Sequence, residues 1–424
     1  MTAPLSFADL DSCLTQADTG GALSVGQVRS AINRCITPVR GIERVALRSA
    51  LGRVLGRALT SPIDVPSHDN SAMDGYALRA ADLAADGETR LRIAGAALAG
   101  APLDAPLAAG QAVRIMTGAM PPVGADTIVP QELVRADAGW LIVPPGQRTG
   151  QHLRRRGEDL RAGSEALPAG RRLTPADLGL LASLGVAEVP VRRRVRVAFF
   201  STGDELRSIG EPLAPGQVYD SNRYTLWSML QRLGVDVVDL GVVADSPADL
   251  ESAMREAAGC ADAIISSGGV SVGDADYTRQ VMARLGEVRF WSLAMRPGRP
   301  MAFGRIGEAC YFGLPGNPVA VMVTFYVVVR DALLHLAGAE PRPLPLIAAS
   351  AAGPIAKRPG RAEYLRGCLE TDGTGQACVR LTGHQGSGVL RSMSEANCLV
   401  VLGHDRGAVA AGETVACLAF DGLI

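Results

Sequence analysis

Two loops rich in small residues and carboxylates could bind a phosphate and a metal ion. Each follows an apolar run typical of a buried strand, 195–200 in one case and 263–266 in the other. Small residues let backbone N–H groups approach an oxyanion, and carboxylates can hold Mg²⁺ directly or through water. The first loop reads Ser201, Thr202, Gly203, Asp204 and Glu205, and the second reads Ser267, Gly268, Gly269, Val270, Ser271, Val272, Gly273, Asp274, Ala275 and Asp276.

Neither loop matches a standard nucleotide-binding motif. The spacing differs from G-x-G-x-x-G and from G-x-x-x-x-G-K-[ST], which argues against dinucleotide binding and nucleoside triphosphate hydrolysis. For a single loop, the structural alternative is that the glycines only form turns and the carboxylates only cap helices. Two such loops in one segment favour the phosphate and metal site.

A third segment places two guanidinium groups on a proline-rich turn. Arg296 and Arg299 enclose Pro297-Gly298, and a later turn introduces an apolar helix over 319–336. A basic turn beside a helix N-terminus suits an anionic ligand. Turn formation alone also explains the prolines, so both interpretations stay open. The later turn reads Leu314, Pro315, Gly316, Asn317 and Pro318.

Two polar segments in the first half of the chain contain candidate acids. In PSHDNSAMDGYA, residues 66–77, Asp74 is either a metal ligand or a turn aspartate, and its spacing favours the turn. The run RRRGED, 154–159, is more typical of a solvated surface than of a channel for anions. No histidine pair at short spacing and no Ser/His/Asp order stands out, so metal-free nucleophilic catalysis is unsupported.

The elements that must position the two loops follow from hydrophobic periodicity. Over 193–340, apolar strands alternate with helical patterns at 222–233 and 246–259. This alternation predicts a parallel sheet with helices on both faces. In such sheets ligands bind beyond the carboxyl ends of the strands. Chemistry is therefore expected in the loops that follow these strands.

The rest of the chain is expected to form three further domains. A capping-box pattern at Ser24 and Gln27, with apolar spacing over 28–35 and 47–55, predicts two amphipathic helices. Thr174 begins another helix, which ends at Gly185. Short β-type runs dominate 64–150 and return after residue 345. The predicted fold is multidomain α/β plus β: a helical domain (1–62 and 151–192), a β-rich insertion (63–150), an α/β three-layer domain (193–340) and a C-terminal β barrel or sandwich (341–424).

Composition describes a folded protein with no general affinity for polyanions. The chain has 424 residues, of which 47% are hydrophobic, and a net charge of −1. This balance gives no support for nucleic-acid or acidic-membrane binding. No signal peptide pattern and no apolar stretch of about 18 residues are apparent, so a cytoplasmic protein is expected. The eight cysteines show no C-x-x-C spacing and read as core residues.

Taken in order along the chain, eight short motifs resemble the molybdopterin molybdenumtransferases, the MoeA and gephyrin E-domain family. The resemblance covers about residues 24 to 420. The motifs are PSHDNSAMDGYA, RIMTGA, RRRGED, FSTGDEL, SSGGVSVGDADYT, RPGRP, FGLPGNP and TGHQGS. The resemblance implies an elongated helical domain, an α/β pterin-binding domain, a C-terminal β barrel, and a homodimer with its sites at the subunit interface. It also implies insertion of molybdate into adenylylated molybdopterin with release of AMP and the help of Mg²⁺.

The resemblance also implies residue roles. The functional residues by matching position are Asp74, Thr117, Asp159, Glu205, Asp245 and Asp276, with Glu205 and Asp276 as candidate Mg²⁺ ligands. The candidate substrate-binding residues are Ser201, Thr202, Gly203, Asp204, Asn222, Gly268, Gly269, Val270, Ser271, Arg296, Arg299, Pro315, Gly316, Asn317 and Pro318. Breaking a phosphoanhydride requires neutralisation of phosphate charge, which metal and arginine provide.

One departure from the family pattern lies in the basic turn. Where the family often has lysines, this chain has Arg296, Arg299 and Ser292. Arginine keeps the charge but changes the donor geometry, whereas Ser292 removes a cation. Weaker molybdate binding and compensation by another arginine are the two alternatives.

Two other functions compete with the transferase. A molybdopterin adenylyltransferase shares the α/β domain, but it does not need the long N-terminal half that bears Asp74; such an enzyme is also the expected pathway partner. A gephyrin-like scaffold that clusters other proteins is the non-enzymatic alternative. Neither alternative uses all the motifs together.

Overall fold

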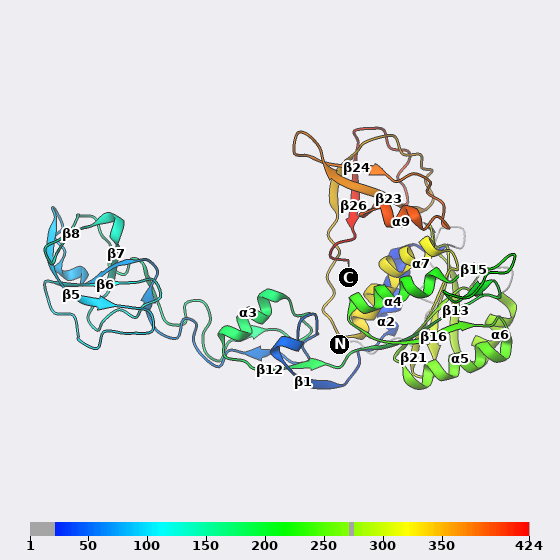
Figure 1. Cartoon of the computed structure of the whole chain (residues 1–424), viewed down its shortest axis with the longest axis horizontal. Coiled ribbons are helices and arrows are strands. Elements are labelled where there is room, and N and C mark those ends of the chain that lie inside the picture. Colours follow the sequence, from blue (N-terminus) through cyan, green and yellow to red (C-terminus); the bar gives the residue numbers. More distant parts are fainter. Residues whose placement is uncertain (1–21, 271–274, 424) are drawn as a thin grey trace.

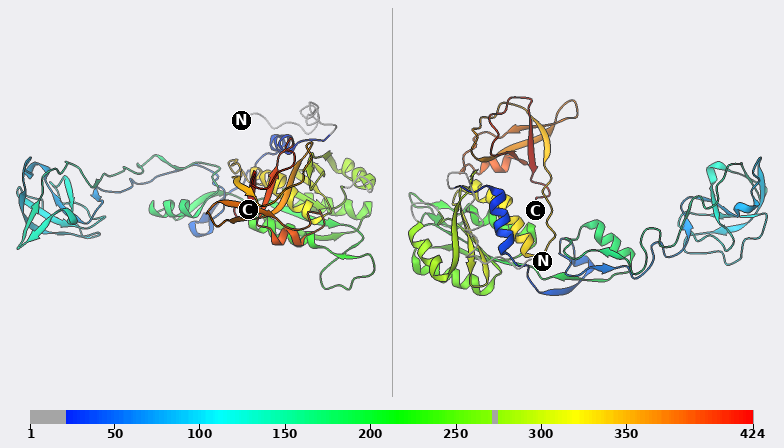
Figure 2. Two further views of the ribbon diagram at one scale, coloured as in Figure 1. Left: turned by 90° about the horizontal axis from the view of Figure 1, so that it is seen from above. Right: turned by 180° about the vertical axis from the view of Figure 1, so that it is seen from behind.

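The chain forms an extended molecule in which a long arm carries a small β domain away from the other two domains (Figures 1 and 2). The structure is a computed structural model and describes residues 22–270 and 275–423. The α/β domain lies at the other end of the arm, and the C-terminal β domain stands beside it (Figure 1). The predicted combination of α/β and β domains is confirmed.

The α/β domain is built on a six-stranded sheet with helices on both faces. Its strand order is β16-β13-β17-β21-β20-β18, and the first four strands are parallel. The last two add in antiparallel fashion. The strands are β13 (Arg196–Thr202), β16 (Asp236–Val243), β17 (Ala263–Ser267), β18 (Gly286–Ser292), β20 (Pro300–Ile306) and β21 (Ala309–Leu314).

Alternation along the central strand explains the three layers. Val197 and Phe199 face one apolar core, whereas Ala198 and Phe200 face the other. A strand buried on both faces reads as a continuous apolar run, which is why 197–200 lacks polar residues, whereas Arg196 at the start of the strand is exposed. The helices that cover the sheet are α2 (Val25–Cys35), α4 (Ser221–Leu233), α5 (Pro247–Cys260), α6 (Ala275–Leu285), α7 (Pro318–Thr324) and α8 (Arg330–Leu336).

The predicted N-terminal helix forms, but it packs against the α/β domain and not in the arm. Ser24 and Gln27 make the expected capping box at the start of α2. Its buried residues, Val28 and Ile32 among them, join the core that contains α4 and α7. Amphipathic spacing identified the buried stripe of this helix, but the surface that covers the stripe is set by the tertiary fold.

A continuous helix over 318–336 crosses the core of the α/β domain. It consists of α7, a π-helical turn at η5 (Phe325–Val329) and α8. By length and composition it could cross a membrane, although Arg330 and Asp331 interrupt its apolar run. However, 78% of its apolar window is buried inside the protein. Its hydrophobicity is therefore explained by packing between the sheet and α2.

The second predicted amphipathic helix, over 47–55, does not form. That segment contains a 3₁₀ turn, η2 (Leu47–Ser49), and a left-handed Gly52 with φ of 73°. Leu55 is buried but Leu51 is 56% exposed, so the apolar residues do not share one helical face. The elements of the arm are β1 (Ile42–Ala46), β2 (Leu59–Thr60), β11 (Glu165–Leu167), α3 (Pro175–Ser183) and β12 (Glu188–Arg192).

The arm consists of outgoing and returning chain held side by side. β1 pairs with β12, and β2 pairs with β11, both antiparallel. The predicted helix after Thr174 forms as α3, with Thr174 and Asp177 as a capping box. Further out, β3 (Asn70–Ser71) pairs with β10 (Leu153–Arg154) at the base of the inserted domain.

The inserted domain is a six-stranded sheet with short connections. Its strand order is β7-β4-β6-β5-β9-β8. Apolar side chains on its two faces form two small cores, one around Leu141 and one around Ile128. Its elements are β4 (Gly75–Leu78), η3 (Ala80–Asp82), β5 (Thr89–Ala97), β6 (Gln111–Ile115), β7 (Thr127–Pro130), η4 (Gln131–Leu133), β8 (Arg135–Asp137) and β9 (Trp140–Val143).

The C-terminal domain is a closed five-stranded barrel. The order β23-β24-β22-β26-β25 returns to β23, so every strand has two neighbours. One further strand, β19 (Met295–Arg296), comes from the α/β domain and pairs with β23. The barrel contains β22 (Ile347–Ala351), β23 (Ala362–Thr371), β24 (Ala377–Leu381), the short helix α9 (Arg391–Glu395), β25 (Cys398–Leu402) and β26 (Thr414–Ala419).

Candidate functional site

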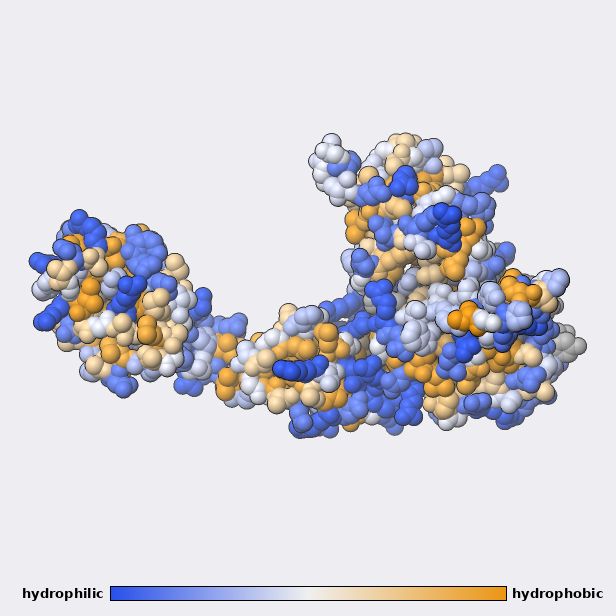
Figure 3. Space-filling model, in the orientation of Figure 1, coloured by the Kyte–Doolittle hydropathy of each residue, from blue (hydrophilic) through white to orange (hydrophobic). Residues whose placement is uncertain are grey.

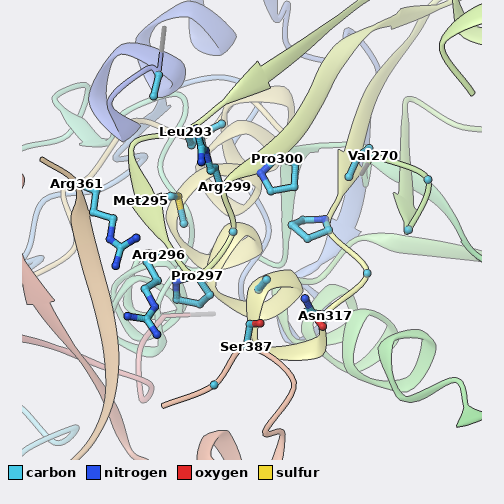
Figure 4. Close-up of a pocket in the computed structure, with 18 of the residues that line it drawn as sticks. Val270, Leu293, Met295, Arg296, Pro297, Arg299, Pro300, Asn317, Arg361 and Ser387 are labelled. Atoms are coloured by element: carbon cyan, nitrogen blue, oxygen red, sulfur yellow. The ribbon is translucent and has the colours of Figure 1, made fainter. Parts of the chain in front are cut away.

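A cleft of about 850 Å³ lies between the α/β domain and the C-terminal barrel (Figure 4). Its floor consists of the loops after three parallel strands, β13, β17 and β21. One wall is the basic turn 296–300, and the barrel supplies 360–361 and 385–387. The cleft therefore occupies the position predicted for a ligand, beyond the carboxyl ends of the strands.

Glycine is required where the first two floor loops meet. Gly268 has φ of 97°, in the left-handed region, and a Cβ on it would lie 2.4 Å from the carbonyl oxygen of Thr202. Its N–H donates to the carbonyl of Leu314 at 3.1 Å. Because no side chain intervenes, the backbone of all three loops stays accessible to a ligand. This arrangement suits a phosphate approached by backbone N–H groups.

Asn222 holds two of the floor loops at a defined separation from beneath. Its Nδ2 donates to Ser267 Oγ at 2.8 Å and to the carbonyl of Gly316 at 2.7 Å. Asn222 is 8% exposed and does not line the cleft. Ser201 is also buried below the floor. Both residues were predicted to bind substrate, and the structure instead makes Asn222 a residue that positions the loops.

The basic turn presents two arginines in different settings. Arg299 Nε donates to Ser292 Oγ at 3.0 Å, so the serine that replaces a family lysine is the partner of an arginine. Arg296 is exposed at the cleft surface. Between them, Gly298 has φ of 95°, and a Cβ there would lie 2.4 Å from Thr324 Oγ1. Glycine therefore lets this turn pack closely on α7.

Arg361 is a cationic residue of the cleft that the sequence analysis did not identify. It immediately precedes β23, whose residues Ala362 and Glu363 pair with Met295 and Arg296 of β19. The pairing brings the guanidinium groups of Arg361 and Arg296 to the same end of the cleft (Figure 4). Glu363 Oε1 accepts from Arg361 Nε at 3.0 Å and orients it.

The barrel also contributes the loop that carries the family motif TGHQGS, residues 382–387. Gln385, Gly386 and Ser387 line the cleft. The fully buried Arg366 holds this loop, since its guanidinium donates to the carbonyl of Gly386 at 3.0 Å and to Ser392 Oγ at 3.0 Å. Burial, with a smaller contribution from the charge of Arg296, lowers the pKa of Arg366 to about 10.

Two carboxylates stand at the mouth of the cleft. Glu205 and Asp245 both line it and are exposed. Thr202 Oγ1 donates to Asp245 Oδ1, and the Asp245 N–H donates to Asp204 Oδ1 at 3.3 Å. Asp204 itself does not line the cleft. The two cleft carboxylates and the glycine loops are a donor set that Mg²⁺ and phosphate together would fit.

Two other predicted acids, Asp74 and Asp159, lie toward the far end of the arm. Asp74 and Thr117 come together there, because both the backbone N–H and the hydroxyl of Thr117 donate to Asp74 Oδ1 at 2.7 Å. These two hydrogen bonds hold the pKa of Asp74 below its ordinary value, and the backbone hydrogen bond has the larger effect. Asp159 is exposed near the base of the inserted domain, where its N–H donates to the carbonyl of Val65 at 3.0 Å.

The predicted residues therefore separate into distinct groups. Ser271 and the side chain of Asp276 lie outside the described residues, and Pro318 begins α7 without lining the cleft. Asp74, Thr117 and Asp159 belong to the arm and its inserted domain, away from the cleft of their own chain (Figure 1). The predicted residues that line the cleft are Thr202, Gly203, Glu205, Asp245, Gly268, Gly269, Val270, Arg296, Arg299, Pro315, Gly316 and Asn317.

Three family models match consecutive parts of the chain. Residues 23–185 match the MoeA N-terminal region (domain I and II), and residues 348–420 match the MoeA C-terminal region (domain IV). Between them, residues 198–335 match a model described as "Probable molybdopterin binding domain".

Individual proteins resemble the chain over nearly its full length. A molybdopterin molybdenumtransferase of Haemophilus influenzae is 42% identical over 95% of this chain and 100% of that protein. A protein of the same name from a Nostoc species is 37% identical over 89% of this chain and 88% of its own length. The crystal structure of a molybdopterin biosynthesis moeA protein from Pyrococcus horikoshii has a TM-score of 0.80 at 27% identity, covering 94% of this chain and all of that chain.

The Asp74–Thr117 contact predicts a measurable titration. A carboxylate whose pKa is lowered by folding stabilises the folded protein fully at pH values above its ordinary pKa. This stabilisation is lost as the pH falls through the lowered pKa. In Thr117→Val the hydroxyl donor is lost, so the pKa of Asp74 should rise toward its ordinary value, whereas Thr117→Ser should keep it low. Carboxyl-carbon NMR titration measures both variants. An unchanged pKa in the valine variant would show that the hydroxyl contributes nothing.

The position of Asn222 predicts a local loss of protection. In Asn222→Ala both donors to the floor loops are lost, so backbone exchange around Gly268 should accelerate by about tenfold. Hydrogen exchange of peptides spanning the end of β17 measures this rate. Thr225→Ala is the matched control, because its hydroxyl bonds only to the Ser221 carbonyl within α4. Equal rates in the two variants would remove the positioning role of Asn222.

Proposed function

Because the chain belongs to the molybdopterin molybdenumtransferases, the MoeA family of transferases in molybdenum cofactor biosynthesis, we propose that its cleft inserts molybdate into adenylylated molybdopterin and releases AMP. The observation that carries the proposal is the meeting of three glycine-containing loops, three arginines and two carboxylates in one cleft. Each group answers a separate chemical need of that reaction.

Molybdate is bound by the arginine pair. Arg296 and Arg361 lie at the same end of the cleft, and each is exposed to a ligand there. A guanidinium offers several N–H donors in one plane and keeps its charge at any physiological pH, which suits an oxyanion. At position 292 the family often has a lysine, whereas this chain has a serine. Arg361 supplies a cation in its place, so molybdate binding does not depend on that lysine.

The phosphates of the adenylylated pterin are bound by the floor loops. The backbone around Gly268 and Gly316 is open because these positions carry no side chain, and Asn222 fixes their separation. Breaking the phosphoanhydride places negative charge on the departing AMP. Donors already held in place stabilise that charge without having to reorganise, which is the main contribution of these loops.

Glu205 and Asp245 are the described residues that would hold Mg²⁺. Both are exposed at the mouth, and Mg²⁺ typically binds through one or two carboxylates together with phosphates and water. When bound, the ion supplies charge neutralisation on the phosphates. The Thr202 hydroxyl donates to Asp245 and keeps that carboxylate turned toward the cleft.

A homodimer brings Asp74 and Thr117 to a cleft. The arm carries these residues away from the cleft of their own chain (Figure 2). A second copy related by twofold symmetry can place its inserted domain over that cleft, because twofold contacts are reciprocal and complete both sites at once. We also propose that the enzyme works in the cytoplasm and receives its substrate from a molybdopterin adenylyltransferase.

The alternatives fit the cleft less well. An adenylyltransferase would use the α/β domain, but Arg361 and Ser387 come from the C-terminal barrel. A pure scaffold would not require glycine at Gly268 or an oriented arginine at 361. Both observations favour catalysis over clustering of partners.

The function is tested by AMP release from adenylylated molybdopterin with Mg²⁺. Release should depend on molybdate in the wild-type protein, and Arg361→Ala should raise the molybdate concentration needed for half-maximal rate by about tenfold or more, since a hydrogen bond to a charged group is lost. Arg358→Ala is the control, because this exposed arginine of the same loop does not line the cleft. AMP release that ignores molybdate would refute the transferase assignment.

The dimer is tested by mixing two inactive variants. Asp74→Asn and Glu205→Gln should each abolish activity as pure proteins. Exchanging their subunits in equal amounts should restore about a quarter of wild-type activity, because half of the dimers are mixed and each has one intact site. If both residues acted within one chain, the mixture would stay inactive.

A further inference from the structure

Five arginines surround a small cavity at the joint between the arm and the α/β domain. The cavity has a volume of about 30 Å³, and the arginines that line it are Arg53, Arg172, Arg192, Arg193 and Arg194. Its other residues come from the C-terminal ends of α4 and α8 and from the link into β13. The surface where the arm meets the α/β domain is markedly hydrophilic (Figure 3).

Only two of these charges are neutralised by carboxylates. Arg53 pairs with Glu43, and Arg193 makes two 2.7 Å hydrogen bonds to Asp262. Arg172, Arg192 and Arg194 make no ion pair with any carboxylate in the described parts of the chain. No acidic residue lines the cavity itself. The joint therefore gathers three arginines without a carboxylate partner among the described residues, of which Arg172 and Arg192 are partly buried and Arg194 is exposed.

Backbone carbonyls satisfy these three arginines only in part. Arg172 reaches the carbonyls of Gly52 and Leu233 at 3.4 Å each, which are long hydrogen bonds. Arg194 donates to the carbonyl of Gly234 at 3.2 Å. Arg192 donates to the carbonyl of Val39 at 2.7 Å, but its Nε is buried with no partner.

Burial makes the imbalance more costly. Arg172 is partly buried, and burial lowers the pKa of its guanidinium, with the charge of Arg330 lowering it further. An unsatisfied buried donor typically costs about 1 to 3 kcal/mol. Because arginine stays protonated in proteins, the group cannot relieve this cost by losing its proton.

We propose that this cavity is a binding site for a monatomic anion, chloride in the cell. A cavity of about 30 Å³ is large enough for one monatomic ion. An anion there would accept from the free Arg192 Nε and neutralise one of the three charges. The site is separate from the cleft and does not depend on the function proposed for it.

The anion would stiffen the joint. Arg53 and Arg172 belong to the arm, Arg193 and Arg194 connect it to β13, and α4 and α8 belong to the α/β domain. An ion bound among them attracts the arginines of the arm and of the link, whereas without it these like charges repel one another. The ion would therefore limit movement of the arm relative to the α/β domain.

Chloride specificity is tested with the full-length protein at constant ionic strength. Replacing gluconate by chloride should raise the midpoint of thermal unfolding by about 2 to 4 °C. Arg172→Gln should lose most of this difference. Arg57→Gln should keep it, because Arg57 is an exposed arginine of the arm that does not line the cavity. Crystals of the wild-type protein grown in bromide should show anomalous scattering at the cavity.

Two outcomes would overturn the proposal. Equal midpoints in chloride and gluconate, with Arg172→Gln destabilised alike in both, would mean that the arginines act only as caps of helix C-termini. Crystals grown in bromide with no anomalous signal at the cavity would refute the site even if Arg172→Gln does not fold. Neither result would affect AMP release, so the function proposed for the cleft is tested independently.

Discussion

The pairing of β19 with β23 is the constraint on which the cleft depends. Two residues of the α/β domain, Met295 and Arg296, become the neighbours of Ala362 and Glu363 in the barrel. Backbone hydrogen bonding in a sheet allows little freedom of register. As a result Arg296 and Arg361 are held together, and one side of the barrel, including Tyr364 and Leu399, also packs into the core of the α/β domain. Without this pairing the cleft would have one basic wall and no opposite side.

The floor of the cleft shows a second constraint, which is close backbone approach. Gly268 packs against Thr202, Gly298 packs against Thr324, and Asn222 spans the gap between two loops. A Cβ on either glycine would clash with the neighbouring residue, and loss of the Asn222 amide would remove both hydrogen bonds that join the loops. The resulting rigidity matters for phosphoryl chemistry, because preorganised donors stabilise developing charge most effectively.

The arm divides the candidate residues between two places. Its antiparallel strand pairs extend from the α/β domain and return to it, and the inserted domain at their end carries Asp74 and Thr117. An arm of this kind has little core of its own, so its orientation depends on the joint where the arginines gather. In the proposed dimer, the position of each inserted domain therefore depends on that joint.

Local patterns in the sequence determined the elements and the floor of the cleft. Apolar runs located β13 and β17, capping residues located α2 and α3, and glycines marked the loops that approach a phosphate, because each depends on neighbours within a few residues. Only the tertiary structure decided that 47–55 is not a helix, that Asn222 lies beneath the cleft, that Thr117 binds Asp74 and that Arg361 joins Arg296. These outcomes depend on contacts between residues distant along the chain, whose register and burial no local pattern contains.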